Sequence, residues 1–299
     1  NNLFTLCHLI YTDTFYMKRK WIRWVSWILL TPIILFVILM VLLYVPPVQN
    51  LLRREVTAYA SKVTGMQIQV ERIDLRFPLN LLVRGVEVIQ QPDTLLSLES
   101  LNVRVQAWPL IKGKVEVDEV TLSRVAVNSA DLMEGMKIKG VLGRFFLQSH
   151  GVDLSNELAV INQVELSDTH MQLLMNDTTT TPKDTTASAP INWKVALHQL
   201  KLKNVSFGMQ LPADSMRMTA HIGEAAINNA QADLKNQYYD LKKFLLSGTS
   251  ASYDTGTAQP TEGFDASHIA VRDIRIALDS LLYKGRDMNA VIREFTMNE

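Results

Sequence analysis

Residues 66–88 read MQIQVERIDLRFPLNLLVRGVEV, and this stretch shows the pattern that decides the fold. Ile68 and Val70 alternate with polar residues, and after a shift of phase Ile73 and Leu75 alternate in the same way. Strict period-2 alternation gives a strand one apolar and one polar face. The stretch therefore predicts half-buried β-strands, with a bulge or bend where the phase shifts.

The same alternation continues through most of the chain after residue 88. Further alternating runs lie at residues 96–105, 115–127, 160–175, 195–210, 216–234 and 289–297. A second phase slip, at Asp118-Glu119, predicts another bulge. Residues 229–246 are interpreted as strands joined by a turn rather than as a helix. We expect a mostly β fold in which residues 66–299 form an elongated, curved antiparallel sheet with one apolar face.

Upstream of the sheet, residues 24–45 read WVSWILLTPIILFVILMVLLYV and carry no charge. At about 1.5 Å per residue this run spans roughly 30 Å, the thickness of a bilayer hydrocarbon core. Trp24 and Trp27 lie near one end, Leu35 near the middle and Tyr44 near the other end, so aromatic rings flank the apolar run as they do at membrane interfaces. Because the run is longer than the apolar region of a cleaved signal peptide, we expect a retained transmembrane helix.

A basic cluster precedes this helix and predicts its orientation. Its members are Lys18, Arg19, Lys20 and Arg23. The positive-inside rule leaves residues 1–23 in the cytoplasm and the body on the far side of the membrane. Met17 directly precedes the cluster, so residues 1–16 are expected to lie upstream of the true start. The chain is also expected to be a fragment truncated at its C-terminus, because it ends inside an alternating run.

Residues 47–64 are predicted to form a short amphipathic helix. Pro47 suits the first helical position, and Gly65 suits the position just past the end. Two roles are open for this helix, because its apolar face could lie on the membrane surface or cap one end of the sheet. Its polar face carries mixed rather than strongly basic charge, which favours the cap.

Residues 176–190 read NDTTTTPKDTTASAP and have no means of packing a core. This composition predicts a disordered polar loop. Because the alternation resumes unchanged beyond it, the loop is interpreted as an exposed insertion within one continuous sheet. As an insertion, its deletion is expected to leave folding intact.

Composition and motifs argue against nucleic-acid binding and catalysis. The chain has 30 basic and 30 acidic residues, and no basic stripe that would bind phosphate backbones. The six histidines show no metal-ligand spacing, and Cys7 is the single cysteine. No nucleophile elbow, phosphate loop or dinucleotide fingerprint is present. We expect a protein that is not an enzyme and uses neither cofactor nor metal.

The order of the elements resembles that of a known family. Residues 103–122 read VRVQAWPLIKGKVEVDEVTL, two alternating strands separated by Pro109-Leu110 and Gly113. The segment IDLRFPLNLLVRGVEV at 73–88 precedes them, and IRIALDSLLYKGRDMNAVIREFTM at 274–297 is similar to strand pairs of the same family. Together with the anchor and the short helix, this order resembles the AsmA-like superfamily, its TamB branch most closely. The resemblance covers the chain from about residue 18 to its end.

What the resemblance implies is a periplasm-spanning β-groove with a hydrophobic interior, anchored in the inner membrane of a Gram-negative type cell. Members are linked to outer-membrane biogenesis and look like carriers of phospholipid between membranes, so membrane lipids are the expected partners. The alternative is a translocation and assembly factor for outer-membrane β-barrel proteins, which would act with an outer-membrane barrel partner. Composition and periodicity do not distinguish phospholipid transport from assembly.

The strand residues taken as candidates for the lipid groove are Ile73, Leu75, Val103, Val105, Val115 and Val117. On sequence alone, such residues favour a closed protein core, whereas the resemblance favours an open groove that lipid can enter. An apolar groove suits acyl chains because each buried methylene contributes about 0.8 kcal/mol. Affinity would then depend on the length of the tail rather than on the headgroup.

Overall fold

The computed structural model describes residues 41, 44–77, 79–111, 116–129, 135–153, 157–175, 192–256, 263, 265–285 and 287–298. The predicted stub at 1–23, nearly all of the predicted membrane helix at 24–45 and the polar segment at 176–190 lie outside the described residues. The chain divides into two compact units, one ending at Leu52 and one beginning at Arg53. Within the described part, no helix is long and apolar enough to cross a membrane.

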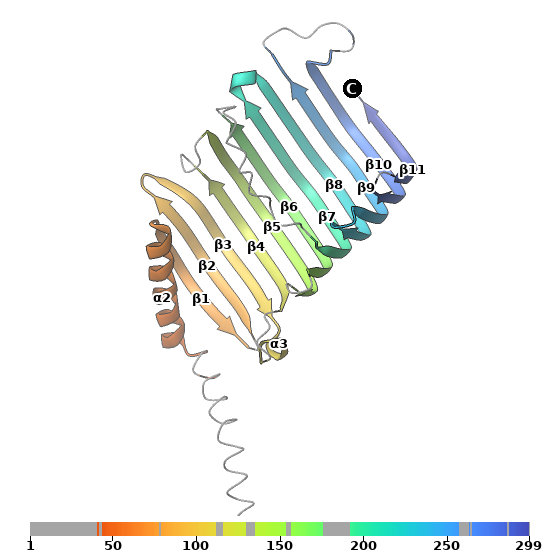
Figure 1. The fold of residues 1–299 in the computed structure, drawn as a ribbon. Helices are drawn as coiled ribbons and strands as arrows, with labels where there is room; N and C mark the ends of the chain where they lie inside the picture. The colour runs from red at the N-terminus through yellow and green to blue at the C-terminus, as the bar shows by residue number, and fades with distance from the viewer. Residues whose placement is uncertain are drawn as a thin grey trace, which may run out of the picture. The chain divides into compact units, whose positions relative to one another are not determined.

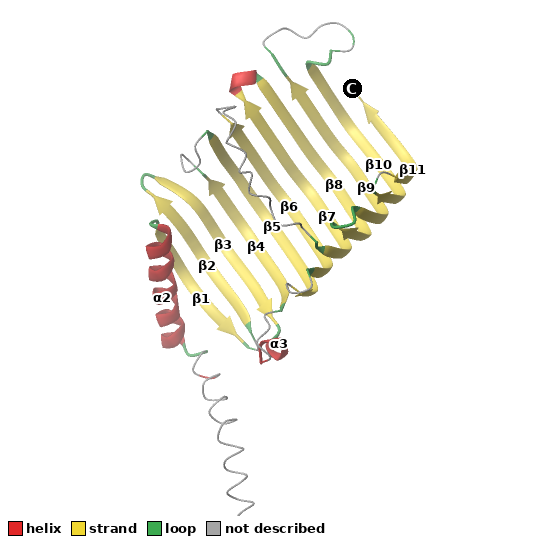
Figure 2. Cartoon of the chain, viewed as in Figure 1, coloured by secondary structure: helices red, strands yellow, loops and turns green. Residues whose placement is uncertain are grey.

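The unit that begins at Arg53 is built on one 11-stranded sheet whose strands lie side by side in sequence order (Figures 1 and 2). The elements are α2 (Pro46–Thr64), β1 (Gln67–Arg76), β2 (Asn80–Gln90), β3 (Asp93–Val105), α3 (Ala107–Ile111), β4 (Val117–Asn128), β5 (Met136–Asp153), β6 (Leu158–Met175), β7 (Lys194–Leu211), the 3-10 turn η1 (Pro212–Asp214), β8 (Met216–Asp233), β9 (Tyr238–Asp254), β10 (His268–Lys284) and β11 (Asp287–Asn298). The mostly β fold and the single continuous sheet are as predicted, and the chain at 229–246 forms strands and a turn.

Every neighbouring pair in the sheet is antiparallel except β6 and β7, which are parallel. The prediction of an antiparallel sheet is therefore correct for nine pairs and wrong for one. A hairpin turn can join antiparallel neighbours, but parallel neighbours require the chain to return along the whole strand. The long connection between Met175 and Lys194 makes this return.

The length of this connection is matched to the strand that it has to pass. Strand β6 has 18 residues, so its ends lie roughly 55 Å apart at about 3.3 Å per residue. Residues 176–193 reach roughly 60–65 Å at most when fully extended. Without residues 176–190, the three remaining residues would reach only about 10 Å. From the observed topology we therefore expect deletion of this segment to disrupt the pairing of β6 with β7, in contrast to the expectation from the sequence.

Helix α2 lies along the first strand from Arg53 onward (Figure 2). The Arg53 guanidinium donates a 2.8 Å hydrogen bond to the carbonyl of Glu71, and the amide of Ile68 donates a 3.1 Å bond to the hydroxyl of Ser61. The chain leaves the helix through Gly65, which has a φ of +69°. These contacts put this part of the helix at the first edge of the sheet, the kind of capping position that the sequence favoured.

A row of positions that drop out of the strand pairing, here called the bulge row, crosses β1–β9 at one level, and because neighbouring strands skip equally many residues there, their register does not shift. Its members are Glu71, Gly85, Glu99, Arg124, Gly143, Asp168, Asn204, Gly223 and Gly248. The pairing skips these positions and continues in register on either side. Several of them adopt the left-handed conformation, including Arg124, Asp168 and Asn204 with φ of 46°, 51° and 53°. The phase shift seen in residues 66–88 corresponds to the first member, Glu71.

The bulge row keeps the apolar side chains on one face of the sheet. In a regular strand, a shift of phase in the sequence would place the apolar residues after it on the opposite face. The extra residue compensates for this shift, so the apolar residues before and after it project from the same face. In β3, for example, Leu96 and Leu98 precede Glu99, and Leu101 and Val103 follow it. A separate bulge lies at Asp118, as the second phase slip predicted, because Arg104 pairs with Glu119 while Val105 pairs with Val117.

Candidate functional site: a continuous apolar sheet face

The predicted groove residues lie together on the first four strands. Leu75 pairs with Leu81, Leu81 with Val103, and Val103 with Val120, which makes one row across β1–β4. Residues that pair directly across a ladder project from the same face. The four side chains therefore form a continuous apolar line.

The other described groove candidates extend this surface. Ile73 belongs to a second row, through Val83 and Leu101 to Leu122. Val105 and Val117 pair with each other beyond the first row. Val115 lies outside the described residues.

Both rows continue past the predicted residues and across the whole sheet. The row of Leu75 continues as Leu147, Val164, Leu200, Ile227, Phe244, Leu278 and Ile292. The row of Ile73 continues as Phe145, Leu166, Leu202, Ala225, Leu246, Ile276 and Phe295. At about 4.8 Å between strands, each row is roughly 48 Å long. The apolar face is here defined as the face that carries these two rows.

Burial shows that the apolar face belongs to a single layer. No large side chain among the described residues is fully buried. Most members of the two rows are half-buried, and Ile73, with 8% of its surface exposed, is among the few that count as buried. Neighbouring strands shield the flanks of these side chains, but a closed core needs a second layer above them. None of the described elements supplies that layer.

The opposite face of the sheet is polar and carries ion pairs between neighbouring strands. Arg104 lies 3.2 Å from Glu119 on β4, and Lys201 lies 3.6 Å from Glu165 on β6. Exposed pairs of this kind contribute about 0–1 kcal/mol each, so they keep this face in water rather than hold the fold together. The sheet thus separates an apolar surface from a hydrated one.

The resolved pKa shifts have local causes on exposed groups. The backbone amide of Asn236 donates a 3.0 Å hydrogen bond to Asp233, and this bond holds the pKa of that carboxyl below its ordinary value. The carboxylate of Asp240, at 2.8 Å, raises the pKa of Lys242. Neither contact involves the apolar face. In the described part of the chain, no three His, Cys, Asp or Glu side chains gather where they could hold a metal ion.

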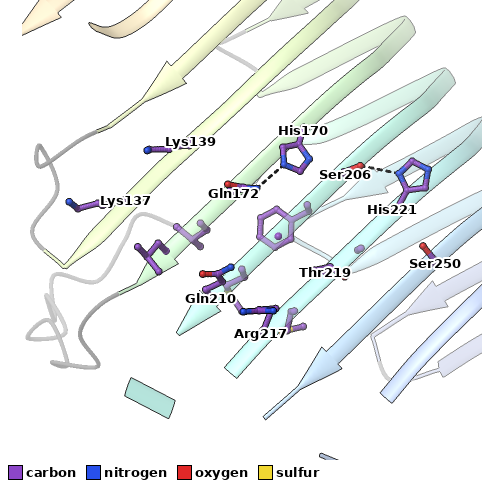
Figure 3. A pocket seen from close by; sticks show the side chains of 17 residues that line it. Lys137, Lys139, His170, Gln172, Ser206, Gln210, Arg217, Thr219, His221 and Ser250 are labelled. Carbon is purple, nitrogen blue, oxygen red and sulfur yellow. Dashed lines mark hydrogen bonds between the residues drawn. The ribbon is translucent and has the colours of Figure 1, made fainter. Parts of the chain in front are cut away.

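A second candidate site is a hollow of about 460 Å³ over β5–β9 (Figure 3), here called the basic hollow. Its basic lining residues are Lys137 and Lys139 of β5 and Arg217 of β8. Two polar contacts lie in its floor: Gln172 Nε2 lies 3.0 Å from His170 Nε2 on the same strand, and Ser206 Oγ of β7 lies 3.0 Å from His221 Nδ1 of β8. These polar residues alternate with the apolar residues of the same strands, so they project from the polar face.

No local sequence pattern indicated the basic hollow. Lys137 and Lys139 flank Ile138, which shows only that the two lysines share one face of a strand. Arg217 joins them through the parallel pairing of β6 with β7, which no sequence pattern revealed. The apolar face was found because its signal is local.

The apolar face and the basic hollow are the two candidate sites of this chain. The first was expected from the alternation of residues along the strands, and the second follows from the observed register. No protein-family model matches the chain, and no curated protein matches it.

Proposed function

We propose that this chain is a non-enzymatic, membrane-anchored protein whose apolar face carries phospholipid between membranes. One observation carries the proposal: two rows of apolar side chains cross all 11 strands on a face that no described element covers. Extended apolar surface exposed to water is unfavourable, so such a face normally has an occupant.

Acyl chains suit this occupancy for physical reasons. Each methylene that leaves water for the apolar face contributes about 0.8 kcal/mol, so a tail gains affinity with its length. The rows offer similar side chains at every strand, and a tail can therefore move from one strand to the next without leaving apolar surroundings. The headgroup needs no dedicated site along such a track.

The proposed location is the inner membrane, with the N-terminus in the cytoplasm and the body in the periplasm. It rests on the uncharged run at residues 24–45, the basic cluster before it and the resemblance to the AsmA-like superfamily. A reporter that is active only outside the cytoplasm should be active when fused after Val127. Activity restricted to a fusion before Met17 would contradict this topology.

A second candidate function is assistance in the assembly of outer-membrane β-barrel proteins, together with a barrel partner. The observation that favours it is β11, the last strand within residues 1–299, whose residues from Asp287 to Asn298 are all exposed. An exposed strand edge offers backbone hydrogen-bonding groups to an incoming strand. Such pairing would involve the edge of the sheet rather than its apolar face.

Site-specific photocrosslinking in membranes of cells that express the full chain separates the two functions. A photoreactive residue at Val103 faces the apolar side, and one at the adjacent Arg104 faces the polar side and serves as the matched control. We expect phospholipid adducts at 103 and none at 104. Absence of lipid at 103, or equal labelling at both positions, would rule out the lipid track. Protein adducts at Val291 of β11, without lipid at 103, would support assembly.

A further inference from the structure

We propose that the basic hollow binds a ligand that bears phosphate groups (Figure 3). The basic hollow lies on the polar face of β5–β9, opposite the face proposed to carry lipid tails. Phosphate binding in the hollow therefore does not depend on the proposed lipid transport, and either can fail without the other.

The charge of the hollow is one-sided. Lys137, Lys139 and Arg217 line it, and no Asp or Glu is among its described lining residues. Elsewhere on the polar face some cations, such as Arg104 and Lys201, have a carboxylate within 4 Å. In the described part of the chain, Lys139 and Arg217 have no such partner. Asp254 pairs with Arg217 across β8 and β9, but it does not line the hollow and forms no ion pair with Arg217 in the described part of the chain. The lining itself carries only positive charge, which favours an anion between the cations.

The register places the two sources of positive charge on opposite sides of an open middle. Lys139 of β5 pairs with Gln172, Gln172 with Gly208, and Gly208 with Thr219 of β8. Strands β5 and β8 are thus three spacings apart, about 14 Å. Gly208 has no side chain, and a Cβ added there would meet only Gln172 Cγ, at 3.8 Å. Long basic side chains on β5 and β8 can therefore approach a ligand that lies above Gly208.

The polar groups of the floor complete the match to phosphate. Ser206, Thr219 and Gln172 carry hydroxyl and amide groups around Gly208, and each already has one partner in the protein, His221, Ser252 and His170 respectively. A phosphate group accepts several hydrogen bonds at once, and it pairs with the fork of Arg and the point charge of Lys. A volume of about 460 Å³ is in the range of small-molecule sites. The separation of the basic groups suits a ligand with phosphate oxygens on two sides, such as a diphosphate.

Calorimetric titration of the full chain in detergent micelles tests the proposal with two probes. Inorganic pyrophosphate represents a free phosphate compound, and glycerol 3-phosphate carries the headgroup chemistry of an acidic phospholipid without its tails. Binding of pyrophosphate alone assigns the hollow to a free phosphate compound, and binding of glycerol 3-phosphate assigns it to a headgroup. If neither probe binds at low ionic strength, the proposal is wrong.

Three variants connect the binding to the hollow. Lys139→Gln and Arg217→Gln should each weaken the affinity about tenfold or more, because each removes a charge-assisted contact. Gly208→Val should abolish binding by filling the middle, while the melting temperature of the chain is retained. The matched control is Lys203→Gln, which removes an exposed cation that does not line the hollow. If Lys203→Gln weakens binding as much as the other variants, the attraction is general and the assignment to the hollow fails.

Discussion

The first six strands and the last five form the same kind of sheet. Where the two halves meet, at β6 and β7, the register is set in another way than within each half. Within each half, neighbouring strands are antiparallel, and several of them are joined by short turns, such as Gln91-Pro92 between β2 and β3 and residues 234–237 between β8 and β9. Between the halves, β6 and β7 run in parallel, and no tight turn fixes their alignment. The apolar rows nevertheless cross this join unbroken, from Leu166 to Leu202. Side-chain pattern can therefore align two strands that no hairpin connects.

The largest effect is expected from breaking the join itself. Deletion of residues 176–190 removes the length that a parallel return requires, so β7 cannot pair with β6 as observed. We expect a loss of more than about 4 kcal/mol in the free energy of unfolding, the range of severe structural damage. The measurement is denaturant unfolding of the full chain, followed by circular dichroism. Replacement of the same residues by an equally long Gly/Ser segment is the control and should keep the fold. Unchanged stability after deletion would show that the two halves do not need this connection.

The next largest effect distinguishes the buried from the open part of the apolar face. Ile73 is 8% exposed, so Ile73→Asp buries an unpaired carboxylate and should cost several kcal/mol. Val105 and Val117 are half-buried on an uncovered face, where water can reach a carboxylate. We expect Val105→Asp and Val117→Asp to lose less than about 2 kcal/mol. Thermal unfolding of the three variants measures the contrast. If all three unfold alike, the rows belong to a closed core instead.

The bulge row allows a direct comparison of the two halves. A Cβ at Gly143 would lie 2.7 Å from Asp168 Cβ and 2.8 Å from the Asp168 carbonyl oxygen, and a Cβ at Gly223 would lie 2.7 Å from the Gly248 carbonyl oxygen. Because the obstructing atoms include backbone, Gly143→Ala and Gly223→Ala should each cost about 1–3 kcal/mol.

Gly208→Ala is the matched control for the bulge-row variants. The new Cβ makes only an ordinary contact, at 3.8 Å. This variant should gain roughly 0.5–1 kcal/mol, because Gly weakens a strand interior. Denaturant midpoints of the three variants give the comparison. A gain in stability for Gly143→Ala or Gly223→Ala would show that the bulge row is not a close approach of backbones in that half.

Much of this fold is local in the sequence, and that part was predictable. Alternation along each strand marks one face apolar, and the phase shifts after Val70 and at Asp118 mark the bulges. Alternation has no direction, however, so it cannot show whether two strands run in parallel or antiparallel. The length of residues 176–193 was the one available signal that the chain passes back along β6 and pairs in parallel. The same length also fits an exposed insertion between antiparallel strands.

The candidate sites show the same division between local and non-local information. The groove candidates Leu75 and Val103 were found because each belongs to an alternating run, and their pairing through Leu81 follows from two hairpins. The basic hollow depends on the alignment of β5 with β8 across the parallel join. Lys139 and Arg217 carry no sequence signal of their proximity, because it arises only when all four strands are in register.

The smallest effect concerns a turn within the last five strands, where the register is encoded locally. The carboxylate of Asp233 accepts hydrogen bonds from the Asn236 backbone amide at 3.0 Å and from the Asn236 side-chain amide at 2.8 Å, and these bonds lower its pKa. Lys194 Nζ, at 3.6 Å, acts in the same direction.

A depressed pKa means that the ionised carboxyl of Asp233 stabilises the folded turn. This contribution is complete above the ordinary Asp pKa of about 3.9 and is lost as the pH falls through the lower pKa of the folded state. We expect the carboxyl carbon of Asp233, followed by NMR, to titrate below the range of unhindered Asp residues. Hydrogen exchange of the Asn236 amide should accelerate, relative to its intrinsic acid dependence, over the same pH interval. Asp233→Asn keeps the shape but removes the titration, so its exchange should lack this step. If the pKa of Asp233 lies at or above the ordinary Asp value, the amide contacts do not stabilise the charged carboxylate. The register of β8 and β9 would then have to be set by the side chains of the facing strands, as it is between β6 and β7.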